Sequence, residues 1–329
     1  MPNLALSLVV AVLAAMLVAP AAYARPANPL QVERDAKLNK GEWFISYHYQ
    51  REEGKGLRSG KDRAKPSDVV DDVITQIPVE LRRDIHTVAF QYAPLERFSL
   101  LISLPIINQK MKQRDFDDGG TLYSTTSSGV GDLEVIGIIP FMVKGQEKLD
   151  VHLGLRLPTG QISRRDNVPG EGKKVLLPLS MQTGSRTASI VTGFTYQGSW
   201  RGLGWGVQGN GTIGFDNNHR GYRLGNEIEV MGWLAHDLTD WLSGSFQLGF
   251  DRTTRARRDK RSGPANHRAS YRDATARKEL ALGPGLSVTL PGLENQRLAV
   301  EASWPVYQSL DGAQVEKDWT LTTGWEFIF

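Results

Sequence analysis

The sequence "DWTLTTGWEFIF" (residues 318–329) alternates between two kinds of side chain up to its last residue. One parity carries Trp319, Leu321, Thr323, Trp325, Phe327 and Phe329, and the other carries Thr320, Thr322, Gly324 and Glu326. A period of two is that of a β-strand, whose successive side chains point to opposite faces. The pattern therefore predicts a strand with one aromatic face, and the rest of the chain must tell what that face contacts.

The same alternation recurs in eleven other segments. The clearest is "KLDVHLGLRLP" (148–158), with leucine and valine on one face and Asp150, His152 and Arg156 on the other. Each segment has about 9 to 12 residues, the length that a tilted strand needs to cross a bilayer. The remaining predicted strands are 41–50, 85–92, 97–107, 131–141, 187–197, 203–215, 224–235, 241–250, 280–290 and 297–307.

Short and long connections alternate between these segments. The turns after the even-numbered strands have four to six residues, whereas most connections after the odd-numbered strands are long and polar. This is the pattern of a bacterial outer-membrane barrel, with periplasmic turns and extracellular loops. We predict an all-β fold, a transmembrane antiparallel up-and-down β-barrel of about 12 strands with periplasmic termini. The long connections are 51–84, 108–128, 159–185, 251–276 and 308–317, with a shorter one at 216–221.

A soluble β-sandwich would also alternate, but its strands are usually shorter. Its interior would not gather aromatic residues at both ends of the strands. Here Trp43 and Tyr92 fall near the short-turn rim, and Tyr49 and Phe250 fall near the other. Two aromatic belts are typical of the lipid–water interfaces around a barrel. The aromatic face of 318–329 is therefore expected to contact lipid.

Composition and the N-terminus agree with export to the outer membrane. A mean hydropathy of -0.32 argues against a bundle of membrane helices. The chain contains no cysteine, and its formal net charge is +3. There is thus no disulfide or thiol chemistry and no nucleic-acid signature. The apolar run 5–19, followed by "AYA", predicts a cleaved signal peptide at 1–24, and the absence of cysteine excludes a lipoprotein. Residues 25–40 are either a partial plug of the lumen or a loose periplasmic segment, and 41–329 form the barrel.

The inward-facing parity is polar and charged. Buried charges must be paired or solvated, so the lumen is either a wet conduit or crossed by ion pairs that only hold the barrel together. The residues that we expect to line a conduit are Asp132, Glu134, His152, Arg156, Glu227 and Glu229.

One extracellular loop is strongly basic. Residues 251–278 carry ten basic and three acidic side chains, and 10 − 3 gives +7. Such a loop would attract anions within a Debye length of about 8–10 Å, either lipopolysaccharide phosphates or anionic substrates at the channel mouth. The predicted anion-binding residues are Arg252, Arg255, Arg257, Arg258, Lys260 and Arg261.

Signals for an enzyme are weak. The six histidines include no His-x-Ser arrangement, and the sequence contains no Gly-x-Ser-x-Gly elbow. We expect no catalytic residues, no metal site and no cofactor.

Three motifs go beyond a generic barrel pattern. They are "SGVGDLEV" (128–135), "GLRLPTG" (154–160) and "MQTGSRTASIVTGFTYQG" (181–198). Together they resemble the outer-membrane transporter family named after the meta-pathway of phenol degradation. The resemblance covers about 41–329, although Arg186 stands where that family's pattern has glycine. It implies passage of small molecules, including hydrophobic or aromatic compounds, across the outer membrane.

The expected function is passive or facilitated transport of small molecules. The alternatives are a closed barrel that acts as a surface-interaction or lipopolysaccharide-binding protein and, third, an outer-membrane enzyme. The expected partners are outer-membrane lipid, lipopolysaccharide and an unidentified small substrate. The barrel-assembly machinery is a further expected partner, since Trp325, Phe327 and Phe329 resemble the C-terminal signal of outer-membrane proteins.

Overall fold

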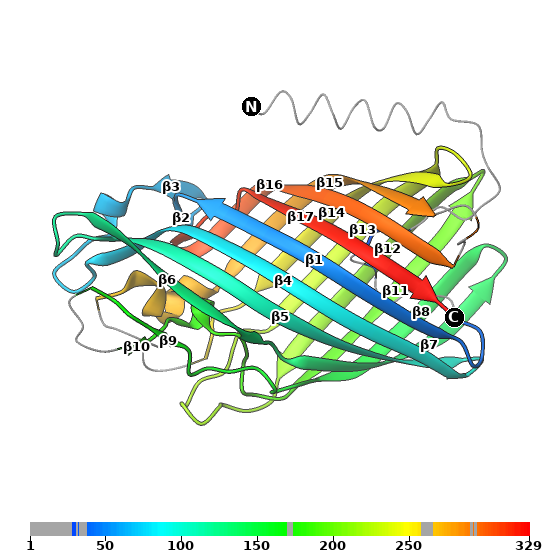
Figure 1. Cartoon of the computed structure of the whole chain (residues 1–329), viewed down its shortest axis with the longest axis horizontal. Coiled ribbons are helices and arrows are strands. Elements are labelled where there is room, and N and C mark those ends of the chain that lie inside the picture. Colours follow the sequence, from blue (N-terminus) through cyan, green and yellow to red (C-terminus); the bar gives the residue numbers. More distant parts are fainter. Residues whose placement is uncertain are drawn as a thin grey trace.

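The computed structural model describes residues 28–30, 32, 38–169, 174–257, 266–289, 292 and 295–329. Twelve antiparallel strands form a closed barrel, as predicted (Figure 1). The expected signal peptide at 1–24 lies outside the described residues. The barrel strands are β1 (Trp43–Lys55), β4 (Gln76–Leu95), β5 (Phe98–Asp115), β6 (Thr121–Val130) with β7 (Leu133–Lys144), β8 (Glu147–Leu157), β11 (Ser189–Trp200), β12 (Leu203–Gly214), β13 (Glu227–Asp237), β14 (Leu242–Thr253), β15 (Arg277–Thr289), β16 (Gln296–Val315) and β17 (Trp319–Ile328).

The first and last strands close the ring. β1 pairs with β17 over ten residue pairs, from Phe44 opposite Ile328 to Glu53 opposite Trp319. Trp43 and Phe329 extend this ladder, because each donates its backbone N–H to the other's carbonyl, at 2.8 and 2.9 Å. The barrel wall therefore has no free strand edge at its seam, which removes the risk of edge-to-edge aggregation.

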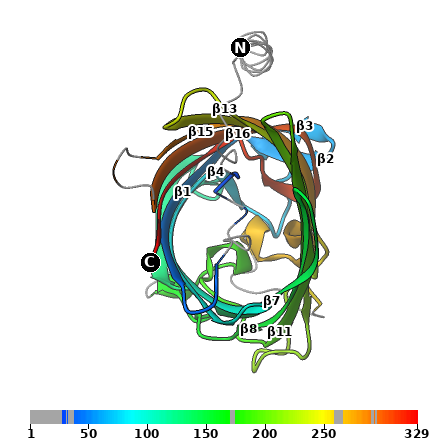
Figure 2. The same cartoon turned by 90° about the vertical axis from the view of Figure 1, so that its right-hand side faces the viewer.

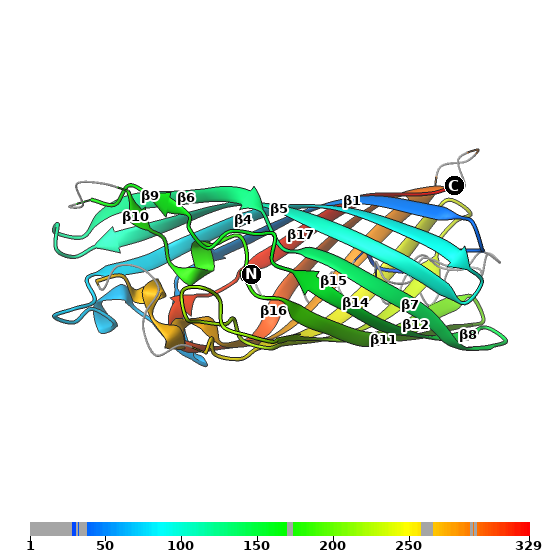
Figure 3. The same cartoon turned by 90° about the horizontal axis from the view of Figure 1, so that it is seen from below.

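The fourth barrel strand is broken in two. β6 pairs with the loop-side part of β5, and β7 pairs with the turn-side part of the same strand. The break falls at Gly131 and Asp132, within the "SGVGDLEV" motif. The loop segment around β9 (Arg165–Asp166) lies beside the other edge of β6, as Figure 3 shows. There the Asp166 carboxylate accepts a 2.7 Å hydrogen bond from the Thr126 backbone N–H.

Three strands are much longer than predicted. β4, β5 and β16 have 20, 18 and 20 residues and extend into the ranges expected to be loops. The reason is physical: beyond the membrane both faces of a strand can meet water, so the apolar–polar alternation that reveals a strand disappears. Shorter elements in the same region are β2 (Leu57–Gly60), β3 (Asp62–Ala64), β10 (Val175–Leu176) and the 3-10 helices η2 (Pro66–Asp68), η3 (Leu179–Met181), η4 (Arg268–Ser270) and η5 (Arg272–Thr275).

Parts of two long loops fold into the barrel mouth. Met181 of η3 and Ala269 of η4 pack with Met111 and Leu177 in one buried apolar cluster. His267, just before η4, forms an isolated bridge with Gln76 at the start of β4. Figure 2, seen from the end that carries the C-terminus, shows these helices inside the outline of the ring. The mouth on the long-loop side is therefore constricted by the chain itself.

The barrel interior also contains an apolar patch. Ala89, Leu101, Ile136, Ile138 and Val191 form a buried cluster on neighbouring strands of one wall. The interior is therefore less uniformly polar than the alternation predicts. No helix among the described residues is long and apolar enough to cross a membrane.

Candidate functional site

A layer of charged side chains divides the lumen. It consists of Glu52 on β1, Arg83 on β4, Arg277 and Glu279 on β15, and Lys317 in the turn after β16, and we call it the charged layer. Glu52 and Arg83 face each other because β1 pairs with β4 at this position, and their side chains lie 3.1 Å apart. Lys317 Nζ lies 2.8 Å from Glu279 Oε1 and 3.8 Å from Glu52 Oε1. The layer thus links β1, β4, β15 and the β16–β17 turn by ion pairs.

On the long-loop side of the charged layer lies an apolar cavity of about 110 Å³, the outer chamber. Its walls include Leu81, Met111, Leu310 and Ala313, and helices η4 and η5 contribute to its lining. Arg83 and the other members of the charged layer also line it, and the lining includes the polar residues Ser180, Gln308, Gln314 and Glu316. The outer chamber therefore combines an apolar body with one charged end.

On the opposite side lies a larger polar cavity of about 320 Å³, the inner chamber. Its lining includes Glu52, Arg277, Glu279 and Lys317, so the two chambers share these four residues. Asp251 also lines the inner chamber. Counted together with the charged layer, it gives three acidic groups against three basic groups. A charged solute crossing here would have to compete with paired charges.

The N-terminal segment Asn28–Leu30 and Val32 lies at the far end of the inner chamber. The Asn28 side chain donates to Gln197 of β11 at 2.7 Å and accepts from the indole of Trp233 on β13 at 3.1 Å. Arg297 of β16 donates to the Asn28 carbonyl at 2.6 Å. These contacts attach the segment to three separate parts of the barrel wall.

Leu30 and Val32 complete the attachment by packing. Leu30 is 1% exposed, and its backbone N–H donates to Glu301 of β16. A Cβ built on Gly324 would lie 2.7 Å from a Leu30 methyl group, so the absence of a side chain at Gly324 makes room for Leu30. Val32 packs against Trp233 and Ala235.

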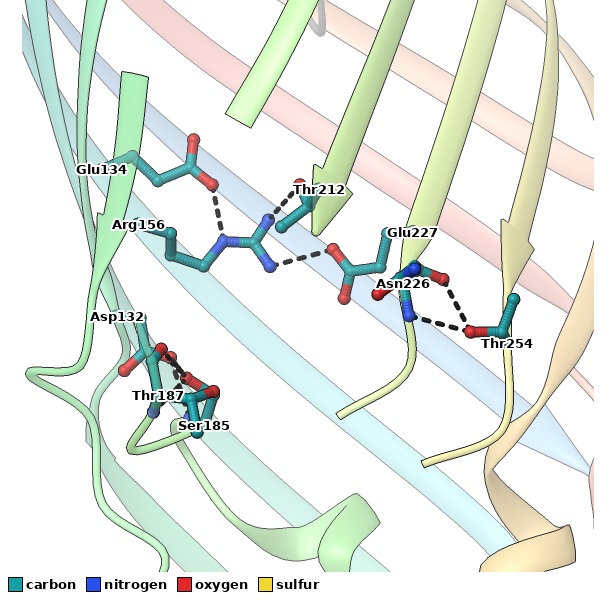
Figure 4. Close-up of polar contacts among 9 residues, drawn as sticks. All are labelled: Asp132, Glu134, Arg156, Ser185, Thr187, Thr212, Asn226, Glu227 and Thr254. Carbon is teal, nitrogen blue, oxygen red and sulfur yellow. Dashed lines mark hydrogen bonds and ion pairs between the residues drawn. The ribbon is translucent and has the colours of Figure 1, made fainter. Parts of the chain in front are cut away.

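Three of the predicted lumen residues form one ion-pair cluster (Figure 4). Arg156 Nε lies 2.8 Å from Glu134 Oε1, and Arg156 Nη1 lies 2.9 Å from Glu227 Oε2. Arg156 also donates to the Thr212 hydroxyl at 3.4 Å. The sequence correctly placed these side chains on the inward parity, and the structure brings them together as a brace along the wall.

Asp132, also predicted to line a conduit, holds backbone together instead. One carboxylate oxygen accepts from the Gly160 N–H at 2.8 Å, and the other accepts from the Ser185 N–H and hydroxyl at 2.8 and 2.6 Å. Gly160 and Gly184 lie so close that a Cβ on Gly160 would be 2.5 Å from the Gly184 Cα. The three sequence motifs therefore meet at Asp132, which explains their residue types without a ligand.

Arg186, which departs from the motif, has a φ of 54°. This is the left-handed region that glycine adopts without strain. The structure thus gives a reason for a glycine at this position, and Arg186 adopts the glycine conformation at an energetic cost.

The remaining two predicted lumen residues differ from each other. His152 faces inward but is completely buried, and its Nε2 lies 3.4 Å from the Thr195 hydroxyl on the neighbouring strand. Glu229 lines the inner chamber. Glu229 is therefore the one predicted residue of the six that lines either of the two described chambers, and it lines the inner one.

The basic loop is only partly described, and Arg258, Lys260 and Arg261 lie outside the described residues. Arg252 is exposed at the end of β14, and Arg255 forms an ion pair with Asp311. Arg257 bridges to Arg223 through backbone hydrogen bonds of 2.8 and 3.1 Å. The loop's role in anion binding stays a prediction.

His267 attaches η4 to the barrel mouth through its bridge with Gln76 at the start of β4. It is 1% exposed, and its Nδ1 accepts a 3.2 Å hydrogen bond from the Ala269 N–H. Burial lowers the pKa of His267 to about 3. The imidazole is therefore neutral near pH 7, and it caps the first turn of η4.

The aromatic residues at the C-terminus form a continuous stack. Trp325 and Phe327 have ring centroids 6.1 Å apart, and Phe327 and Phe329 are 5.2 Å apart. Phe329 also stacks with Trp43 across the seam at 6.4 Å. No cluster of potential metal ligands occurs among the described residues.

Sequence reasoning missed Glu52, Arg83 and Lys317, which it placed in loops 51–84 and 308–317. The inward parity of β1 could have identified Glu52, because it continues the series Ser46, His48. No local pattern indicated that η3 and η4 would fold into the mouth.

The comparisons with known proteins agree on the architecture. No family model and no curated protein match the sequence. Among solved structures, an outer membrane channel from Pseudomonas putida F1 is similar, with 12% identity, a TM-score of 0.63 and coverage of 92% of this chain and 100% of that chain. A weaker similarity is to the transport unit of the autotransporter AIDA-I from Escherichia coli, with 10% identity, a TM-score of 0.49 and coverage of 89% and 92%. The similarity to the Pseudomonas putida channel and the closed ring of strands show the fold of an outer-membrane β-barrel, and the exposed apolar belt of the chain places it in the bacterial outer membrane.

Proposed function

We propose that the barrel passes small, uncharged or weakly polar molecules, including aromatic ones, across the outer membrane by facilitated diffusion. The observation that carries this proposal is the pair of chambers on either side of the charged layer. The proposed route runs from the outer chamber through the charged layer to the inner chamber.

The outer chamber suits an apolar solute of the size of one aromatic ring. Its volume of about 110 Å³ is comparable to the roughly 150 Å³ apolar cavity that binds benzene in an engineered protein. Met111 and Ala313 are 2% and 4% exposed, so they present apolar surface that is already removed from bulk water. An apolar solute would there exchange water for hydrocarbon contacts.

The charged layer favours neutral solutes over ions. Its acidic and basic groups are equal in number. An ion that is attracted by the groups of opposite charge is therefore repelled by the groups of like charge. Glu52 and Lys317 are also engaged by partners on other strands. A neutral solute can pass such a layer by small side-chain movements, and no charged side chain then has to be buried without its partner.

The N-terminal segment is proposed to act as a partial plug. Its hydrogen bonds to the wall include those of Asn28 with Gln197, Trp233 and Arg297 and that of the Leu30 N–H with Glu301. A gate must be bound firmly enough to close and weakly enough to open, and polar contacts to a lumen meet both needs. We expect the plug to restrict ion flow more than it restricts the entry of a solute into the outer chamber.

The resemblance to the phenol meta-pathway transporters supports the same substrate class. The solved channel from Pseudomonas putida F1 shares the fold of this chain. The resemblance of the motifs and the apolar lining of the outer chamber both support small hydrophobic or aromatic substrates, and the two arguments rest on different residues.

The experiment that tests this function fills the outer chamber. Ala313→Phe should lower the uptake of toluene into proteoliposomes at least about tenfold, because a buried phenyl ring occupies the chamber volume. The matched control is Ala302→Phe on the same strand, since Ala302 lies between Glu301 and Ser303 and so faces the opposite side. Equal toluene uptake by the wild type and Ala313→Phe would overturn the proposed route.

The alternative function is a closed barrel that acts at the cell surface. It is favoured by the presence of chain inside the lumen at both ends, η4 on one side and the N-terminal segment on the other. The two functions predict different currents across a planar lipid bilayer that contains the protein. Discrete current steps that grow when Gly324→Val displaces Leu30 support transport, whereas a silent bilayer with inserted protein and no toluene uptake supports the surface role.

A further inference from the structure

The outer wall of β4, β5 and β6 carries a groove of about 460 Å³ that no part of the transport route uses. Five basic side chains line it: Arg82 on β4, Lys110 on β5, and Arg164, Arg165 and Lys174 from the loop beside β6. We call it the basic groove. The strand register explains the first two, because Arg82 pairs with Lys110 on the outward parity of adjacent strands.

The basic groove has an excess of positive charge. Two carboxylates lie in it, Asp84 and Asp166, and 5 − 2 gives +3. Asp84 is already engaged by Arg82 at 3.0 Å and by Arg51 at 2.8 Å. Asp166 accepts hydrogen bonds from the Thr126 N–H and hydroxyl.

Three exposed cations of the groove have no acidic partner. Within the part of the chain that the structure describes, no carboxylate lies at ion-pair distance from Lys110, Arg165 or Lys174. Arg164 lies against Gly129, where a Cβ would overlap with its guanidinium group. The basic groove is thus built by close packing of the loop on β6, with its lysines left available.

The height of the basic groove on the barrel is that of the outer lipid headgroups. Twelve residues separate Phe98, at the short-turn rim, from Lys110 on the same strand. At about 3.4 Å per residue and a tilt of about 40°, this corresponds to roughly 30 Å along the membrane normal. The apolar band of such barrels is about 25 Å tall, so Lys110 lies just beyond its outer edge.

Apolar side chains continue directly from the basic groove toward the membrane. On the outward parity, Val88, Ile106 and Val130 are 47%, 41% and 41% exposed. Ile106 pairs with Val130 one step below the Asn108–Ser128 pair that borders the groove. A ligand held here would meet cations at one end and hydrocarbon at the other.

From this arrangement we infer that the basic groove binds lipid A, the phosphorylated glycolipid end of lipopolysaccharide, with a phosphate at Lys110 and Lys174 and acyl chains along Val88, Ile106 and Val130. Phosphate on a cationic cluster gains charge-assisted hydrogen bonds, which are stronger than neutral ones. The apolar strip adds area burial that a free phosphate ion could not gain.

The test measures binding of fluorescent lipid A to the full-length mature barrel in detergent. Lys110→Ser, Arg165→Ser and Lys174→Ser together remove three cations without breaking an ion pair among the described residues. Because each cation near an anionic lipid adds to the electrostatic attraction, we expect the affinity for lipid A to fall at least about tenfold. The matched control is Arg252→Ser, Arg257→Ser and Lys278→Ser, which removes the same charge from the basic loop and leaves the Arg255–Asp311 ion pair intact.

The outcomes separate the possible sources of binding. A loss confined to the groove variant, with weaker binding of lipid A that lacks its phosphates, supports the proposal. A loss confined to the loop variant overturns it and assigns the site to residues 251–278. Displacement of lipid A by millimolar inorganic phosphate also overturns it, because the basic groove would then be a plain anion site. Unchanged resistance to unfolding in SDS at room temperature verifies that both variants are folded.

Discussion

Arg156 on β8 reaches Glu227 on β13, two strands beyond its neighbour in the wall, with Nη1 and Oε2 2.9 Å apart. The same guanidinium binds Glu134 on β7. A single side chain thus connects strands on both sides of β11 and β12. The ion pairs stiffen this part of the barrel. They also engage Glu134, Arg156 and Glu227, three of the residues that the sequence suggested as the lining of a conduit.

Arg156→Met should destabilise the barrel by about 3 kcal/mol, because it leaves two partly buried carboxylates without their cation. The measurement is urea unfolding in detergent micelles, followed by tryptophan fluorescence. The triple variant Arg156→Met with Glu134→Gln and Glu227→Gln removes all three charges and should recover most of the loss. Equal losses in the single and triple variants would contradict a role for charge pairing.

A methyl group on Gly184 should loosen the loop 161–187. Gly184→Ala places a Cβ against the backbone of Gly160 and beside Asp132, where backbone cannot move away cheaply. We expect trypsin to cleave this loop at least about tenfold faster, since local opening exposes backbone to proteolysis. The matched control is Gly249→Ala, whose Cβ meets no atom within 4 Å.

Arg186→Gly should stabilise the barrel. An L-residue in the left-handed region costs about 1–2 kcal/mol, and Arg186 has a φ of 54°. Allowing for the entropy that glycine loses on folding, we expect a net gain of about 1 kcal/mol in urea unfolding. Arg186→Ala retains the Cβ and should show no gain, so a similar gain in both variants would exclude backbone strain as the cause.

The twelve strands and their order could be predicted because lipid outside and polar lumen inside impose the alternation on every strand. The charged layer could not be predicted in the same way. Glu52 and Lys317 lie where strands leave the membrane, and there polar residues occupy both faces. The two chambers depend on η4 and the N-terminal segment folding into the lumen, and those contacts are long-range. Asp132 was recognised as inward and motif-bound, but its three hydrogen-bond donors come from segments more than 25 residues away.

Acid should open the constriction formed by η4. The pKa of His267 is about 3 when it is buried and about 6.5 when it is exposed. The closed state therefore prefers the neutral imidazole, and its stability falls as the pH drops below about 6.5 and continues to fall until about pH 3. At pH 4.5, two units below the exposed value, the loss is about 3 kcal/mol.

We expect single-channel conductance to rise between pH 7 and pH 4.5 in the wild type. His267→Asn retains an acceptor for the Ala269 N–H but does not titrate in this range, so its conductance should not change with pH. An equal rise in the wild type and His267→Asn would assign the pH response to other groups.

Phe329→Ala should impair assembly in cells more than stability in vitro. The backbone hydrogen bonds with Trp43 are retained in this variant, and only the stacked ring is removed. If the terminal ring is read by the barrel-assembly machinery, the amount of folded barrel in the outer membrane should fall several-fold, while refolding of the purified chain into detergent stays near normal. Phe215→Ala is the matched control, because Phe215 and Phe329 are 49% and 51% exposed and so lose a similar contact with lipid. Equal falls in the two variants, measured by heat-modifiable mobility of outer-membrane fractions, would reduce the role of Phe329 to lipid anchoring.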